Sequence, residues 1–232
     1  MPAMPVVLVH GAWGGAWAWG YVQNELNDLG ITSTAIDLPS RESASATMAD
    51  DAAAIRAAIE ETGGPCVVVG HSYSGVPVSE ATADNPLVAH IVYTCAVMPE
   101  VGQSTLDVMG SDPTPSELGN SIVGTDDGMC VLDPEGAMRI LFNDVTEEEA
   151  APIIAGLGPF NGNCFGEGPT AVGWSDTPST YILATQDLVF SPECQRTMAQ
   201  NATNIVEVDA GHIPVLSKAR EVAEAIAAAA QS

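Results

Sequence analysis

Residues 65–75 read Pro-Cys-Val-Val-Val-Gly-His-Ser-Tyr-Ser-Gly and carry the strongest fold signal in the chain. The run from Cys66 to Val69 is rich in β-branched residues and too short for a helix, and Gly63 and Gly64 precede it. This pattern predicts a strand buried on both faces. The small residues that follow predict a sharp turn into a helix, with Ser72 at the turn.

The neighbours of Ser72 favour a strand-to-helix elbow. Gly70 and Ser74 flank it where such an elbow brings backbone segments into close contact, so both residues must be small. The customary pattern is Gly-x-Ser-x-Gly, whereas this chain has Ser74 at the fifth position and its glycine one residue later, at Gly75. We predict that Ser72 is a nucleophile; the alternative is an ordinary loop serine.

The rest of the chain alternates strands and helices. Strands are predicted at 6–9, 31–36, 88–94, 180–184 and 205–208, and helices at 17–29, 47–62, 73–83, 192–200 and 215–230. This rhythm predicts an α/β fold with a mostly parallel, doubly wound sheet. The rhythm stops over residues 98–173, which are richer in Gly, Pro, Asp and Glu and show helical patches only around 134–143 and 146–157.

We therefore expect one domain whose core comprises residues 1–97 and 174–232. Residues 98–173 are predicted to form an inserted lid, not an independent domain, because so long an insertion in a compact domain is usually functional. A length of 232 residues suits one full α/β domain. If the chain were divided into two domains, neither half would have its own set of strands.

Composition narrows the class of partner. The formal charge is −24 with only six Lys and Arg, which disfavours nucleic acid and anionic membranes because both need clustered cations. We expect a neutral small-molecule substrate, although acidity can also serve solubility alone. No apolar run approaches the roughly 20 residues of a membrane-spanning helix, and we expect no signal peptide. The sequence does not decide whether the protein forms a homodimer.

Cysteine usage predicts a reduced, cytoplasmic protein. The five cysteines form no Cys-x-x-Cys pair, and Cys66 and Cys95 fall in predicted core strands, where thiols pack as small apolar groups. The sequence does not decide whether Cys130 and Cys164 form a disulfide.

The first strand runs into a glycine-rich loop that begins at His10. Its spacing does not fit Gly-x-Gly-x-x-Gly, and no Gly-Lys-Ser/Thr follows, so dinucleotide and nucleoside triphosphate sites are disfavoured. We expect no cofactor and no metal. Such a loop can instead aim a backbone N–H at developing negative charge, and Ala12 is the candidate donor. The N–H of Tyr73, at the start of the elbow helix, is the second.

A serine hydroxyl needs a base to take its proton, and the base needs an acid to hold its tautomer. Asp187 and His212 each follow a late predicted strand, which completes the order Ser72, Asp187, His212. The carboxyl ends of parallel strands share one sheet edge, so we predict that these three side chains meet there. Trp13 is a candidate for the substrate pocket.

Each role has rivals. Asp209 and Asp176 compete with Asp187 for the acid, and an Asp37-Leu38-Pro39 turn favours a structural role for Asp37. His10 is expected to brace the first loop, and His71 and His90 to be structural or variable.

The chain resembles the α/β-hydrolase superfamily, and within it the plant methylesterase and hydroxynitrile lyase group with its bacterial esterase relatives. The motifs that carry the resemblance are the Val-Val-Leu-Val-His-Gly-Ala-Trp run at 6–13, the Gly-Ala-Trp-Ala-Trp run at 15–19, the elbow, Asp187 and the Gly-His pair at 211–212. The resemblance implies an α/β-hydrolase fold with a reduced N-terminal part, a triad of Ser72, Asp187 and His212, and oxyanion donors at Ala12 and Tyr73.

Two positions bear on the reaction. Members of the group that are similar to the lyases tend to carry Thr at the position of Gly11 and Lys at the position of Ile213, where the cation stabilises departing cyanide. We therefore predict a serine carboxylesterase that acts on a small or medium neutral ester through an acyl-enzyme. The alternatives are a lyase, a lactonase or a carbon–carbon hydrolase with the same triad, and a non-catalytic ligand-binding module.

Overall fold

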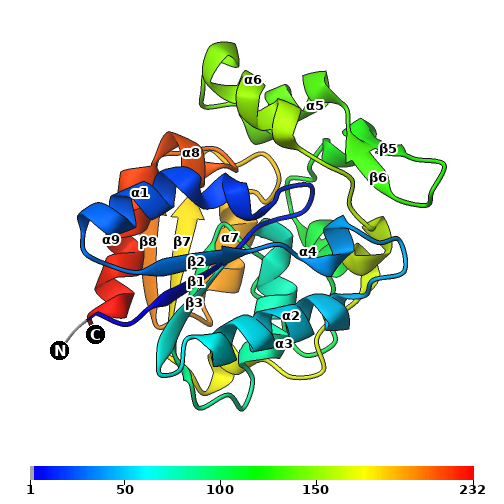
Figure 1. Cartoon of the computed structure of the whole chain (residues 1–232). Helices are drawn as coiled ribbons and strands as arrows, with labels where there is room; N and C mark the ends of the chain where they lie inside the picture. The colour runs from blue at the N-terminus through cyan, green and yellow to red at the C-terminus, as the bar shows by residue number, and fades with distance from the viewer. Residues whose placement is uncertain (1–2) are drawn as a thin grey trace.

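A computed structural model describes residues 3–232; residues 1–2, the start of the predicted core segment, lie outside it. Six strands form one sheet in which every neighbouring pair is parallel (Figure 1). In spatial order they are β2 (Ser33–Ile36), β1 (Val6–Val9), β3 (Cys66–His71), β4 (Val88–Thr94), β7 (Ser179–Ala184) and β8 (Asn204–Val208). The predicted parallel, doubly wound sheet is confirmed.

Helices cover both faces of the sheet, as the alternation of side chains along β1 requires. Val6 and Leu8 belong to the apolar cluster that includes residues of α1 (Gly20–Asp28) and α9 (Ala219–Ala230). Val7 and Val9 belong to the opposite cluster, with α2 (Met48–Glu61) and α3 (Gly75–Thr82). In Figure 1 these two helix pairs lie on opposite sides of the strands.

Element ends differ from the predictions by a few residues, two of the predicted helices begin with a 3-10 turn, and a third is divided in two. A 3-10 turn, η1 (Ala16–Trp19), precedes α1, and η3 (Ser72–Ser74) precedes α3. The predicted last helix is divided into α8 (Pro214–Ser217) and α9, because Lys218 leaves helical geometry at φ −134° and ψ 36°. The α7 helix (Pro192–Ala199) is capped at its N-terminus by Ser191, whose side chain accepts from the N–H of Cys194.

The sheet order reverses between β1 and β3. From β1 the chain goes to β2 on one side, and the later strands of this sheet, which are β3, β4, β7 and β8, lie on the other side. In open parallel sheets, ligands bind in the crevice at the carboxyl ends of the strands where the order reverses. The loops that contain Ala12 and Ser72 follow β1 and β3 and therefore flank this crevice.

The insertion between β4 and β7 holds more structure than its sequence indicated. The two expected helices are α5 (Pro134–Leu141) and α6 (Glu147–Gly156). The hairpin of β5 (Ile122–Gly124) and β6 (Cys130–Leu132) and the helix α4 (Thr105–Ser111) were not predicted. The signal for α4 was the capping box of Ser104 and Asp107, which bond to each other's backbone N–H groups. Short 3-10 turns complete it: η4 (Leu118–Ser121), η5 (Gly162–Gly166) and η6 (Gly173–Ser175).

Residues 116–157, which we call the roof, form the part of the insertion that stands apart from the sheet, whereas α4 packs close to the core (Figure 1). The limits 98–173 for a lid remain a prediction. All five cysteines are free, so Cys130 and Cys164 do not pair. Within residues 3–232 no helix combines the length and the apolar character needed to cross a bilayer.

Candidate active site

The elbow holds Ser72 in strained backbone geometry. Its φ is 57°, a left-handed value that is uncommon for a residue with a side chain and that presents the hydroxyl at the apex of the turn. The closest backbone approach lies at Gly75, where a Cβ would stand 1.9 Å from the carbonyl oxygen of Val97. The glycine displaced by one position in the sequence therefore occurs where the packing demands it.

Ser74 does more than fit into a tight space. Its buried hydroxyl accepts from the N–H of His71 at 2.9 Å and lies 3.0 Å from the carbonyl oxygen of Val9. The side chain thus connects the end of β3 to the end of β1. A glycine at this position, as in the customary motif, would lack both contacts.

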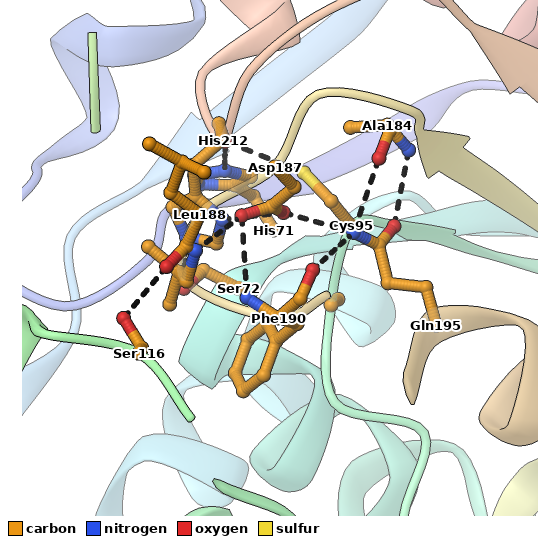
Figure 2. Close-up of polar contacts among 12 residues, drawn as sticks. His71, Ser72, Cys95, Ser116, Ala184, Asp187, Leu188, Phe190, Gln195 and His212 are labelled. Atoms are coloured by element: carbon orange, nitrogen blue, oxygen red, sulfur yellow. Dashed lines mark hydrogen bonds and ion pairs between the residues drawn. The ribbon is translucent and has the colours of Figure 1, made fainter. Parts of the chain in front are cut away.

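The structure brings Ser72, His212 and Asp187 into one chain of hydrogen bonds (Figure 2). The Ser72 hydroxyl donates to Nε2 of His212 at 2.8 Å, and Nδ1–H of His212 donates to Oδ2 of Asp187 at 2.8 Å. His212 and Asp187 are 1% and 2% exposed, so this pair is shielded from water. The geometry is that of a nucleophile, a base and an orienting acid.

Asp187 is held by further donors. Its Oδ1 accepts from the N–H groups of Val189 at 2.7 Å and Phe190 at 3.2 Å, and its Oδ2 accepts from Nε2 of Gln195 at 3.0 Å. Sequence reasoning did not single out Gln195. The rival Asp209 instead accepts from the Gln186 side chain.

The other residues weighed for the site bond to groups other than Ser72, Asp187 and His212. Asp176 accepts from Ser175, and Asp37 accepts from the N–H of Ala16 in the loop after β1. His90 is buried beside the hydroxyl of Thr180, as expected for a structural residue.

The backbone of His212 is anchored by two side chains that sequence reasoning had not assigned to the site. Nε2–H of His71 donates to the carbonyl oxygen of His212 at 2.8 Å, and the thiol of Cys95 lies 3.3 Å from the same oxygen. Burial lowers the pKa of His71 to about 3, so this ring is neutral at physiological pH. The only sequence signal for its role is its place beside Ser72.

The side chain of His10 holds the loop after β1 in place through two hydrogen bonds. His10 accepts from the N–H of Leu38 at 3.1 Å through Nε2, and its Nδ1–H donates to the carbonyl oxygen of Gly11 at 2.8 Å. Burial lowers the pKa of His10 to about 4, which keeps one nitrogen free to accept. Within residues 3–232 the N–H of Ala12 has no hydrogen-bond partner.

Tyr73 is anchored through its side chain. Its buried hydroxyl donates to Oδ2 of Asp51 at 2.8 Å, and Asp51 also accepts from the N–H and the hydroxyl of Ser40. Burial raises the pKa of Asp51, and these donors offset part of that cost. The contacts tie the elbow to α2 and thereby fix the residue that carries the second candidate oxyanion N–H.

A pocket with about 540 Å³ of empty space, its opening included, lies over Ser72. The loop after β1, Ser72 and the segment after His212 form its floor, and Trp13 stands in its wall, packed against Phe160 and Phe165. The roof contributes only apolar side chains, from Leu118, Leu141, Phe142, Ile153 and Leu157. None of the lining residues among 3–232 is Asp, Glu, Lys or Arg.

One group of metal-ligand side chains gathers within the described part of the chain, formed by His71, Cys95 and His212. Both ring nitrogens of His212 already bond to Asp187 and Ser72, and His71 and Cys95 both contact the His212 carbonyl. His212 therefore has neither ring nitrogen free for a metal ion in this arrangement.

Comparisons with known proteins agree with the fold. The sequence profile described as "Alpha/beta hydrolase family" matches residues 6–225. "Probable hydrolase R7" of a Phoma species is 30% identical, with 96% of each chain covered, and "Methylesterase 9" of Arabidopsis thaliana is 28% identical, with 94% of each covered. Among solved structures, a pyrethroid hydrolase from Sphingobium faniae superposes with a TM-score of 0.86 at 22% identity, over 99% of this chain and 98% of that one.

Proposed function

The chain belongs to the alpha/beta hydrolase family, and from this premise we propose that it is a serine carboxylesterase for a small or medium uncharged ester. The observation that carries the proposal is the chain of two 2.8 Å hydrogen bonds from Ser72 through His212 to Asp187, beneath an apolar pocket. The named hydrolases and methylesterases among its relatives support the same class of reaction.

In the proposed reaction, Oγ of Ser72 attacks the ester carbonyl carbon while its proton passes to Nε2 of His212. Asp187 holds the Nδ1–H of the imidazolium that forms. The N–H groups of Ala12 and Tyr73 donate to the oxyanion, and loss of one such donor typically costs about 10²- to 10³-fold in rate.

Collapse of this intermediate expels the alcohol, which takes the proton from His212, and leaves an acyl group on Ser72. Water then attacks the acyl-enzyme with His212 as the base. The carboxylic acid leaves, and Ser72 regains its proton.

The pocket supports an uncharged substrate. Its lining holds no fixed charge among the described residues, and desolvation of an ionised group in such a site is unfavourable unless a partner compensates it. The formal charge of −24 adds long-range repulsion against anions. We expect p-nitrophenyl butyrate to react at least about tenfold faster than the p-nitrophenyl monoester of succinic acid, whose acyl chain ends in a carboxylate.

Two positions favour hydrolysis over the lyase reaction. Ile213 borders the pocket and supplies no cation for departing cyanide. At Gly11 a Cβ would lie 2.9 Å from Cβ of Ser72 and 3.0 Å from Nδ1 of His71, so the threonine typical of the lyases would displace the elbow. Mandelonitrile cleavage without ester turnover would reverse this preference.

The decisive experiment is labelling by a fluorophosphonate probe. We expect the protein to be labelled, Ser72→Ala to abolish labelling, and p-nitrophenyl ester turnover to fall by roughly 10⁴-fold or more. Ser45→Ala, at an exposed serine far from the site in sequence, is the matched control and should react like the parent protein. Unchanged labelling of Ser72→Ala would remove Ser72 from its role, and tight binding without turnover would favour a ligand-binding module.

A further inference from the structure

Gln195 is a buried polar residue that the proposed reaction does not use directly. It lies in α7, has no exposed surface and does not border the pocket. A fully buried side-chain amide is costly unless its oxygen and its N–H groups are paired. Its partners therefore indicate what the residue holds in place.

The partners of Gln195 lie on both sides of Asp187 in the chain. Oε1 accepts from the N–H of Ala184, the last residue of β7, at 3.0 Å. Nε2 lies 3.0 Å from Oδ2 of Asp187, 2.8 Å from the carbonyl oxygen of Phe190 and 3.3 Å from that of Ala184. Only an oxygen can accept from the Ala184 N–H, which settles the orientation of the amide.

The bond from Gln195 reaches the same carboxylate oxygen that accepts from His212. Oδ2 of Asp187 takes Nδ1–H of His212 from one side and Nε2–H of Gln195 from another (Figure 2). Oδ1 is held separately by the backbone N–H groups of Val189 and Phe190. With a donor on each oxygen besides His212, the carboxylate cannot turn about its χ2 angle without breaking a buried hydrogen bond.

We propose that Gln195 is a positioning residue that aims Oδ2 of Asp187 at His212. The inference rests on the proposed function. In this role the amide stabilises the orientation in which His212 keeps Nδ1 protonated and Nε2 free for Ser72. It also clamps the strand end before Asp187 to the turn after it.

The titratable groups around Asp187 and His212 are two thiols, a phenol, a histidine and two carboxylates. Burial raises the pKa values of the neighbouring thiols and phenol, and burial lowers that of the histidine beside His212, so all of them are uncharged at neutral pH. These neighbours are Cys95, Tyr181, Cys194 and His71, and the nearby carboxylates Asp112 and Asp144 face Cys194 and Cys95 respectively.

The first test replaces the amide by an apolar side chain of similar size. We expect Gln195→Met to lower kcat for a p-nitrophenyl ester by about 10- to 100-fold, the range of a lost hydrogen bond to a charged group. KM should change less than about twofold, because Gln195 does not border the pocket. Gln200→Met, an exposed position at the end of the same helix, is the matched control and should match the parent protein.

A double-mutant cycle separates positioning from a general structural role. If Gln195 acts through Asp187, Gln195→Met should cost at most about twofold in the Asp187→Ala background, because the group it aims is gone. In each of these variants, we expect the rate at which the fluorophosphonate probe labels Ser72 to fall in proportion to the loss of kcat. An equal loss with and without Asp187, or a loss that appears in KM alone, would overturn the proposal.

If Gln195→Met does not fold, a second variant still tests the proposal. Gln195→Glu has the same shape, and its carboxyl can donate to Asp187 only while protonated. Its kcat relative to the parent protein should therefore fall as the pH rises from about 5 to 9. A relative kcat that stays at the parent value throughout would contradict the role.

The failure of this inference is distinct from that of the proposed function. A parent protein that neither hydrolyses esters nor reacts with the probe overturns both. A parent protein that does both, with Gln195→Met at full kcat, overturns only the role of Gln195.

Discussion

The floor and the roof of the pocket are built in different ways. The floor holds its polar groups in loops that follow parallel strands, and the bonds among Ser72, His212 and Asp187 are buried or nearly so. The roof offers the pocket only apolar side chains. Where the roof meets the floor, Asn143 donates to the carbonyl oxygen of Gln186 and Ser116 to that of Leu188.

Under the proposed function, this difference assigns chemistry and selectivity to different parts of the chain. Reacting groups need geometry within a fraction of an ångström, which strand ends supply, whereas an apolar wall needs only the correct shape. The two regions meet at the residues that flank Asp187 and next to His212, because Gly211 lies directly under the side chain of Asn143. Substitutions in the floor should therefore affect folding and kcat, and substitutions at the junction should affect KM.

The largest effect is expected beneath the floor, at Gly75, the first residue of α3. Gly75→Ala would place a Cβ 1.9 Å from the rigid backbone oxygen of Val97, so we expect a loss on the order of 3 kcal/mol or more in the free energy of unfolding. Urea denaturation measures it. Gly20→Ala, at a helical glycine where an added Cβ would meet nothing within 4 Å, should be neutral or stabilising. Equal stability of the two variants would contradict the tight contact beneath the elbow.

A smaller effect concerns pH and the neutral His71. An unfolded histidine takes up its proton near pH 6.5, whereas folded His71 does so only at about 3. Between these values the unfolded state binds more protons, so the unfolding free energy falls as the pH falls, by roughly 2 kcal/mol from pH 7 to pH 5. His71→Gln removes this contribution, and its stability should depend less on pH in that window.

The parent protein must be compared with the His71→Gln variant because His10 and the many carboxylates are present in both, so that their contributions to the pH dependence cancel. Urea denaturation at pH 7, 6 and 5 gives the two slopes. Parallel slopes would mean that His71 is not held neutral in the folded protein.

The smallest effect is expected at the junction. Gly211→Ala would bring a Cβ to 2.3 Å from Oδ1 of Asn143, a side-chain atom that can yield by moving the roof. We expect KM for a p-nitrophenyl ester to rise about threefold with kcat nearly unchanged. Adding Asn143→Ala removes the nearer of the two clashing oxygens, the other being Oδ1 of Asp144 at 2.8 Å, and should restore part of the loss. A fall in kcat at constant KM would instead show that Gly211 belongs to the floor alone.

Much of the floor could be predicted because its signals are local. Four β-branched or apolar residues between turn signals marked β1 and β3, and the residues after each strand had to share one edge of the sheet. The capping box of Thr47 and Asp50 likewise marked the start of α2. The β5–β6 hairpin was missed because its strands are only three residues long, which is too short for a recognisable pattern. They also pair mainly with each other and lie outside the main sheet.

The sequence by itself determined the parallel sheet, its interruption after β4 and the order in which Ser72, Asp187 and His212 follow their strands. Only the tertiary structure decided which groups support them: Gln195 against Asp187, and His71 against the carbonyl of His212, 141 positions away in the chain. The reason is physical. Strand and helix signals arise from neighbouring residues, whereas a buried amide or imidazole acquires its role from whichever unpaired polar group the completed fold brings within about 3 Å.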